Sequence, residues 1–135
     1  MPSTAELVCV DPARINEVWP LVRDRVKIAI ERTGLSDFDL IEREILAGNQ
    51  LVWIAWDNGI SAVATTHKTS IGSKTICTLT ACQGYDRERW LPLFKRIEQY
   101  AKDEGCAAMR IFGRKGWERV LDGYKVENVV MEKVL

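Results

Sequence analysis

The sequence contains a single histidine, His67, and this scarcity argues against two kinds of site at once. The four cysteines (Cys9, Cys77, Cys82 and Cys106) are not spaced as in zinc-binding motifs, and one histidine cannot supply the missing ligands. A Cys–His nucleophile would need His67 beside a thiol, but six residues of stagger in the expected hairpin place Cys82 roughly 20 Å away. The sequence therefore predicts no metal site, and the cysteines are expected to be small core residues.

The sequence also has no excess of charge, because 19 Lys and Arg balance 19 Asp and Glu. Such a chain has no overall field to attract nucleic acid or an anionic membrane surface. No apolar run approaches the ~20 residues needed to span a bilayer, and residues 1–6 lack the basic and apolar regions of a signal peptide. We therefore expect a cytoplasmic protein with reduced thiols, no membrane association and no nucleic-acid partner.

With 135 residues, the chain has the length of one domain, spanning residues 1–135. A β-rich segment at 6–10 predicts a first strand. Asp11-Pro12 has the residues of a helix start, and apolar residues at helical spacing predict a helix over 13–32. Pro20 is expected to kink or split this helix. A second helix is expected from Ser36 or Asp37 until Gly48.

Three β-strands are expected next, over 51–56, 60–68 and 74–81, and Asn58-Gly59 favours a hairpin turn between the first two. Both faces of the resulting sheet are largely apolar, so helices are expected on each side. The expected register opposes His67 to Ile76. It places Val52, Ile54, Trp56, Val63, Ile76 and Cys82 on one face, and Leu51, Trp53, Ala55, Ala62, Ala64, Leu79 and Ala81 on the other.

The last third predicts a helix over 90–102, a strand over 107–112, a short helix over 117–121 and a final strand over 126–134. The full order is β-α-α-β-β-β-α-β-α-β, which is an α/β fold. The helix ends in Ala101-x-x-x-Gly105-Cys106, and Gly123-Tyr124 precedes the final strand. This order and these motifs resemble the GNAT superfamily of N-acetyltransferases across the whole chain. The resemblance implies a single GNAT-like domain with a mixed central sheet and helices on both faces.

The resemblance also implies that acetyl-CoA or another acyl-CoA is the cofactor. In this family a loop of the pattern Arg/Gln-x-x-Gly-x-Gly/Ala holds the pyrophosphate with backbone amides and a helix N-terminus. Here the family glycines fall near Glu88 and Trp90, while Gln83-Gly84 stands several residues early. The expected cofactor-binding residues are Ala81, Cys82, Gln83 and Gly84 through their backbone, with Arg87 and Arg89 pairing with phosphates. Asp86 and Glu88 suit a helix start but repel an anion.

The family often uses a tyrosine as the acid that protonates the leaving thiolate, and the matching position here falls at or near Arg119. Tyr85 and Tyr124 are therefore the only candidates, and Tyr124 is expected to be a core aromatic. Two functions remain open. One is an acyl-CoA-dependent N-acyltransferase acting on a small amine or a protein. The other is a non-catalytic GNAT-like binding or assembly protein.

Gly113 to Leu121 resembles small GNAT-like proteins encoded in phage and prophage genomes, which would place the protein in a host cytoplasm. Five tryptophans are many for this length. Trp53 and Trp56 point to opposite sheet faces, so each is expected to pack under a helix. If Trp90 and Trp117 are exposed, they would form a protein-binding patch with a basic rim of Arg114, Lys115 and Arg119. A homo-oligomer is compatible with the sequence.

Overall fold

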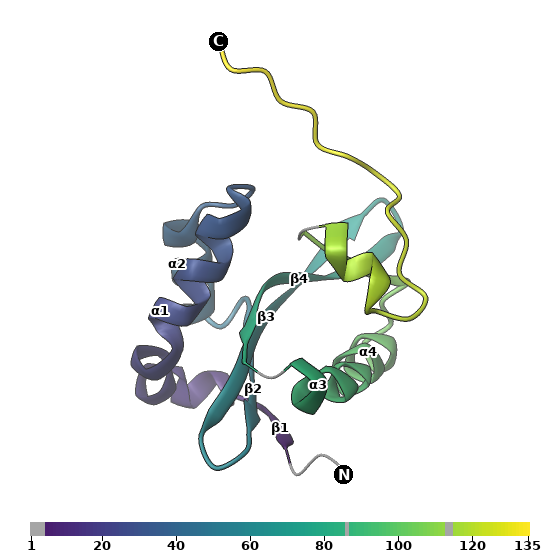
Figure 1. Cartoon of the computed structure of the whole chain (residues 1–135). Coiled ribbons are helices and arrows are strands. Elements are labelled where there is room, and N and C mark those ends of the chain that lie inside the picture. Colours follow the sequence, from purple (N-terminus) through teal and green to yellow (C-terminus); the bar gives the residue numbers. More distant parts are fainter. Residues whose placement is uncertain (1–4, 86, 113–114) are drawn as a thin grey trace.

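The computed structural model describes residues 5–85, 87–112 and 115–135, and within them the chain forms one five-stranded sheet (Figure 1). The first four strands are antiparallel neighbours, and the fifth runs parallel to the fourth. The sheet is therefore mixed, as the resemblance implied. The strands are β1 (Glu6–Cys9), β2 (Leu51–Trp56), β3 (Ile60–Ile71), β4 (Lys74–Gly84) and β5 (Ala108–Ile111).

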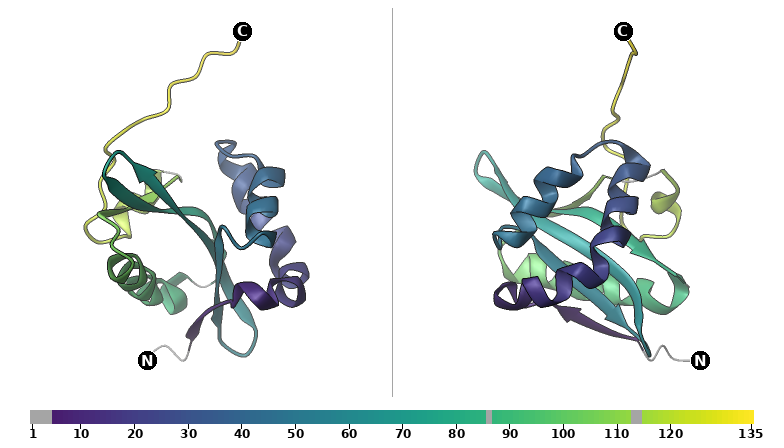
Figure 2. Two further views of the ribbon diagram at one scale, coloured as in Figure 1. Left: turned by 180° about the vertical axis from the view of Figure 1, so that it is seen from behind. Right: turned by 90° about the vertical axis from the view of Figure 1, so that its left-hand side faces the viewer.

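Helices cover both faces of this sheet (Figures 1 and 2). The helices α1 (Ile15–Thr33) and α2 (Phe38–Leu46) lie on one face, and α3 (Arg87–Trp90) and α4 (Phe94–Asp103) lie on the other. Both apolar faces of the sheet are thereby buried, which confirms the predicted α/β architecture. Three short 3-10 segments complete the described elements: Pro12–Arg14, Leu91–Leu93 and Lys115–Arg119.

Local signals set the ends of the first two helices. The Asp11 carboxylate accepts a hydrogen bond from the Ala13 amide at 2.9 Å and so caps the 3-10 segment Pro12–Arg14 that leads into α1, and Asp37 caps α2 in the same way. Gly34 ends α1 with a φ of 65°, a conformation that glycine adopts without strain. Pro20 lies inside α1, which runs unbroken through it. Of the two predicted effects of Pro20, a split helix is therefore wrong.

Three apolar clusters fill the space between the sheet and its helices, and the smallest contains Ala55, Ala62 and Trp90. The cluster under α1 and α2 contains Val10, Ile15, Trp19, Val22, Val26, Ile30, Phe38, Ile41, Ile45, Val52, Ile54, Val63 and Ala81. The cluster under α4 contains Trp53, Ala64, Leu79, Phe94, Ile97 and Leu121. Trp53 packs as predicted. Trp56 does not, because it lies at the end of β2, beside an irregularity in the pairing with β3, and is 52% exposed.

A β-bulge changes the expected faces of β4. Thr66 pairs with Leu79 but Thr65 pairs with Ala81, so Thr80 is an extra residue in β4. The extra residue reverses the alternation beyond it. Ala81 therefore packs toward α1 and Cys82 toward α4, opposite to the predicted faces. The predicted opposition of His67 and Ile76 is also wrong, because the register is shifted and His67 pairs with Thr78.

The final strand predicted over 126–134 is absent, and residues 124–135 form no regular structure. Figure 2 shows this segment extending away from the domain. The prediction was wrong because β-propensity does not supply a pairing partner, and this segment pairs with none of the five strands that the structure describes. The predicted helix over 90–102 is also interrupted: a 3-10 turn that contains Pro92 separates α3 from α4.

Candidate functional site

The sheet opens where β4 and β5 separate. Their last pair is Leu79 with Ile111, and the bulged Thr80 follows at once. Beyond this point, β4 has no pairing partner on its β5 side among the described residues. A cavity of about 70 Å³ occupies the opening, and we call it the β4–β5 cleft. It is lined by Ala29, Arg32, Thr33, Leu79, Thr80, Ala81, Cys82, Ile111, Phe112 and Trp117.

Buried hydrogen bonds fix the bulge that opens the cleft. The Thr80 hydroxyl donates to the side-chain oxygen of Gln50 at 2.8 Å, and the Thr65 and Thr80 hydroxyls lie 2.6 Å apart. Since Thr80 donates to Gln50, Thr65 is the donor in the second bond. Gln50 and Thr65 are buried. Unpairing these groups would cost about 1–3 kcal/mol each, so the floor of the cleft is preformed.

Arg25 of α1 holds the end of β4, and sequence reasoning missed this residue. Its guanidinium donates to the Gln83 side chain and to the carbonyls of Ile60 and Ser61, at 2.9 and 3.2 Å for the carbonyls. It also lies over the Tyr85 ring, 5.0 Å from the centroid. The sequence feature that could have identified Arg25 is its position three residues after the buried Val22, at the edge of the apolar stripe of α1.

Gly84 is a packing position. A Cβ atom there would lie 2.6 Å from Nε1 of Trp90 and 2.7 Å from Cβ of Ala62. Trp90 is 7% exposed and packs against Trp117, with 6.2 Å between ring centroids. The condition for a protein-binding patch of Trp90 and Trp117 is therefore not met, because the indole of Trp90 is buried by β4. Arg114 and the side chain of Lys115 lie outside the described residues.

The predicted cofactor-binding residues divide into three groups. Ala81 and Cys82 line the β4–β5 cleft, and Gln83 and Gly84 continue the same strand, paired to β3. They were expected in a loop, but β4 extends through them. Arg87 is exposed at the start of the four-residue α3. The side chain of Arg89, like the whole of Asp86, lies outside the described residues. Phosphate binding by Arg87 and Arg89 remains a prediction.

The two tyrosines lie outside the residues that line the cleft. Tyr124 packs edge-on against Phe94 and donates a hydrogen bond to the Glu98 carboxylate at 2.7 Å. Burial, and then the hydrogen bond to Glu98, raise the pKa of Tyr124. Tyr85 is 65% exposed beneath Arg25. A catalytic role for either phenol remains a prediction.

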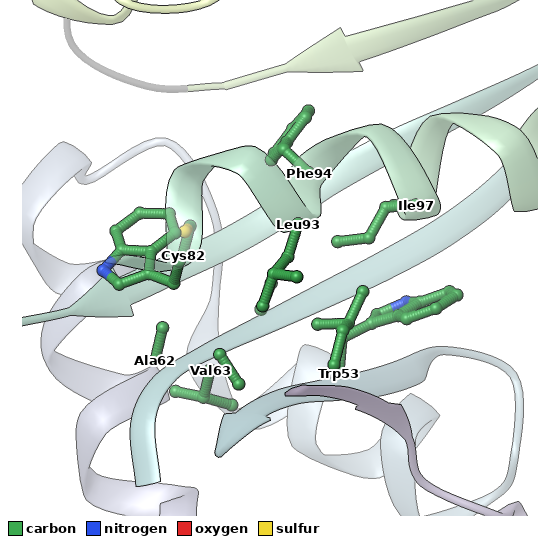
Figure 3. Close-up of a pocket in the computed structure, with 11 residues that line it drawn as sticks. Trp53, Ala62, Val63, Cys82, Leu93, Phe94 and Ile97 are labelled. Atoms are coloured by element: carbon green, nitrogen blue, oxygen red, sulfur yellow. The ribbon is translucent and has the colours of Figure 1, made fainter. Parts of the chain in front are cut away.

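A second, smaller cavity of about 20 Å³ lies between α4 and the sheet (Figure 3). In that view the side chains of Leu93 and Ile97 point from the helix toward the strands, and Trp53, Ala62 and Cys82 are among the strand residues that line the cavity. Its volume is close to that of one water, but its lining is almost wholly apolar, and such voids stay dry. We regard it as a packing void of the α4 cluster and not as a substrate site.

Cys82 lies between the two cavities and borders both. Burial raises the pKa of its thiol to about 12. At pH 8 the Cys82 thiol is therefore almost wholly neutral, and a neutral thiol is a poor nucleophile. The cleft thus contains a cysteine that cannot carry an acyl group efficiently.

We predict that iodoacetamide at pH 8 modifies the exposed Cys9 while leaving Cys82 unmodified in the folded protein. Peptide mapping by mass spectrometry measures both sites in one sample. In guanidinium chloride both thiols should react, which controls for intrinsic reactivity. Equal rates of modification in the native protein would show that Cys82 is accessible and ionised, contrary to this assignment.

Within residues 5–85, 87–112 and 115–135, no three His, Cys, Asp or Glu side chains converge to form a possible metal site. None of the helices in that part of the chain combines the length and apolar character needed to cross a membrane.

No family model and no curated protein matches the sequence. Solved structures do match the fold. A predicted acetyltransferase with acetyl-CoA from Clostridium acetobutylicum has a TM-score of 0.64 at 13% identity, over 96% of both chains. An aminoglycoside acetyltransferase from an uncultured soil metagenomic sample, in complex with sisomicin, has a TM-score of 0.68 at 14% identity, over 97% of this chain and 95% of that one. A GNAT family acetyltransferase from Staphylococcus aureus has a TM-score of 0.63 at 12% identity, over 97% and 98%. At these identities the matches show that the chain has the GNAT fold.

Proposed function

We propose that the protein is an acyl-CoA-dependent N-acyltransferase that binds its cofactor in the β4–β5 cleft. The observation that carries this proposal is the opening of the sheet at Thr80, where the parallel strands separate and leave a strand edge facing the cavity. One structural neighbour with this fold is described with acetyl-CoA. The likeness of fold supports the same cofactor here.

The residues of the cleft suit an acyl-CoA. The pantetheine arm is extended and carries amide groups, so the unpaired edge of β4 at Ala81 and Cys82 can bind it as it would bind another strand. Phe112 and Trp117 offer apolar surface on the opposite side. Arg32 supplies a positive charge from the last turn of α1, and Arg87 supplies another beyond the end of β4. These charges would bind the phosphates.

The bound cofactor would supply an activated acyl thioester. The backbone amides of β4 that face the cleft would stabilise the negative charge that develops on the acyl oxygen during attack by an amine. Because the Cys82 thiol stays neutral, the acyl group would pass directly to the amine without a covalent enzyme intermediate. The transfer would form a carbonyl–nitrogen bond and break the carbonyl–sulfur bond; CoA would leave as its thiolate, and the proton that the amine loses to water would restore the free thiol.

A small amine is the acceptor class that we propose. The support is a structural neighbour that is described as an aminoglycoside acetyltransferase in complex with sisomicin. A protein amine is the alternative acceptor. A phage or prophage origin and a cytoplasmic location remain predictions from the sequence.

A non-catalytic binding or assembly protein is the second candidate function. The observation that favours it is the packing of Trp90 against Gly84, since the one glycine near the expected phosphate loop is already used for packing. The first candidate requires cofactor binding and turnover, while the second requires neither.

Isothermal titration calorimetry with acetyl-CoA tests the proposal. We expect binding at one site, and at a hundredfold excess over the dissociation constant the ligand should add about 2.7 kcal/mol to the free energy of unfolding. Release of free CoA thiol is then followed with a panel of amines that includes an aminoglycoside and a peptide N-terminus. No binding at millimolar acetyl-CoA would refute the cofactor assignment. Binding without thiol release from any amine would favour the non-catalytic candidate.

A further inference from the structure

We propose that residues 126–134 form an exchange strand that pairs with β5 of a second copy of the chain. The resulting dimer would have two-fold symmetry, with each copy supplying one strand to the sheet of the other. The proposal does not depend on the proposed enzymatic function. It rests on three features of the described structure: an apolar terminal segment, an open strand edge, and the way in which the segment is anchored.

The terminal segment is more apolar than a solvated tail, with five large apolar side chains among its nine residues. Its large apolar side chains are Val126, Val129, Val130, Met131 and Val134, and their exposed fractions range from 48% to 90%. Burial of such side chains is favourable, because it removes apolar surface from water. Valine also favours strands, whereas disordered tails are poor in such residues. The exposed segment therefore lacks a partner that its sequence favours.

The strand β5 offers a matching edge. It pairs with β4 on one side only, and no described residue pairs with its other side. Open edges of this kind are normally covered, charged or paired, because they bind further strands. Met109 and Ile111 of β5 belong to the α4 cluster, so a strand added here would extend a sheet that is already packed. In an extended strand, Val126, Val130 and Val134 would share one face with Asn128 and Glu132, and Val129 and Met131 would lie on the other.

The anchoring of the segment directs it to another molecule. The Tyr124 hydroxyl is bound to Glu98, and the Val126 amide donates to the Glu118 carboxylate at 2.8 Å. From Val126 onward the chain runs outward, away from its own sheet (Figures 1 and 2). Nine extended residues reach roughly 30 Å, enough to cross to a neighbour. A return to its own β5 would require the chain to reverse at this anchor, whereas exchange leaves both hydrogen bonds in place.

Reciprocal exchange also explains why one chain carries both features. In a two-fold dimer, the same surface of each copy contacts the same surface of the other. Each copy would then bury one apolar segment and cover one open edge, which removes both exposed features together.

Light scattering coupled to size-exclusion chromatography tests the proposal, using the full chain over a range of 10–200 μM. We expect a dimer. Val130→Pro should yield a monomer, because proline removes a backbone donor and is excluded from paired strands. Val130→Thr keeps the donor and the strand propensity, so it should remain dimeric. A monomeric wild-type protein, or a dimer that survives Val130→Pro, would overturn the proposal.

Cross-linking provides a second measurement that does not rely on a destabilising variant. One copy carries Arg110→Cys and a differently tagged copy carries Val130→Cys, both in a Cys9→Ser background. After mixing, unfolding and refolding together, mild oxidation should link the two tagged chains. If the strand instead closed on its own β5, only a chain with both substitutions would form the disulfide, and it would do so within one molecule. That result would overturn exchange.

Discussion

Gly84→Ala is expected to lower the free energy of unfolding by about 1–3 kcal/mol, the usual cost of overpacking a filled core. The added methyl group would lie within 2.8 Å of Nε1 and Cε2 of Trp90 and of Cβ of Ala62. Neither neighbour is a flexible chain end, since Trp90 is buried and the Ala62 Cβ is attached directly to β3. The measurement is the urea concentration at the midpoint of unfolding, with the slope held common to both proteins.

Gly116→Ala is the matched control. A Cβ there meets nothing within 4 Å, so its effect should fall within about 0.5 kcal/mol, as for other surface substitutions. Trp90→Phe in the Gly84→Ala background should recover part of the loss, because the smaller ring vacates the space that the methyl group needs. A stable Gly84→Ala protein with weakened acetyl-CoA binding would contradict this interpretation. It would mean that Gly84 lacks a side chain to admit a phosphate group of the cofactor, and not to accommodate the indole of Trp90.

The elements that the sequence predicted well are those governed by local chemistry. Asp11-Pro12 starts the 3-10 segment that leads into α1, and Asp37 starts α2, through their own side chains and ring geometry. Asn58 and Gly59 have φ values of 56° and 144°, which few other residues tolerate, and they fix the hairpin between β2 and β3. Both apolar faces of this hairpin required cover, so the two helical layers followed from composition alone.

The bulge at Thr80 could not be predicted in this way. A threonine in a β-rich run has no feature that marks it as an extra residue. Its place depends on Gln50, which lies 30 residues earlier, and on Thr65 in the neighbouring strand. The one-residue shift exchanged the faces of Ala81 and Cys82, although both still line the cleft. The family resemblance thus directed attention to β4, while the orientation of the side chains on β4 required the structure.

The arginines near the cleft also could not be identified from the sequence. The sequence directed attention to Arg87 and Arg89, which follow β4 directly. The structure instead places Arg32 on the cleft lining and Arg25 at the end of β4, and both come from α1. Only the packing of α1 across β4 brings these residues together, and periodicity assigns a helix one apolar face without identifying the strand that it crosses.

Arg32→Glu is expected to weaken acetyl-CoA binding by about 10- to 100-fold, if the cofactor phosphates approach the cleft past the end of α1. The substitution replaces a positive charge with a negative one beside a polyanion, and each charge-assisted contact contributes about 1.5–3 kcal/mol. The loss should shrink as sodium chloride rises from 50 to 500 mM, because salt screens exposed charges. Calorimetry at several salt concentrations measures both effects.

Arg43→Glu is the control for this substitution. Arg43 lies in the last turn of α2, as Arg32 lies in the last turn of α1, and both are exposed. Each substitution therefore costs the same favourable interaction with the helix dipole, about 0.3–1 kcal/mol, and changes the net charge equally. Arg43 does not line the β4–β5 cleft, so its affinity for acetyl-CoA should stay within about twofold of wild type. If both variants weakened acetyl-CoA binding equally, the effect would come from the net charge alone. That result would contradict the assignment of the β4–β5 cleft as the cofactor site.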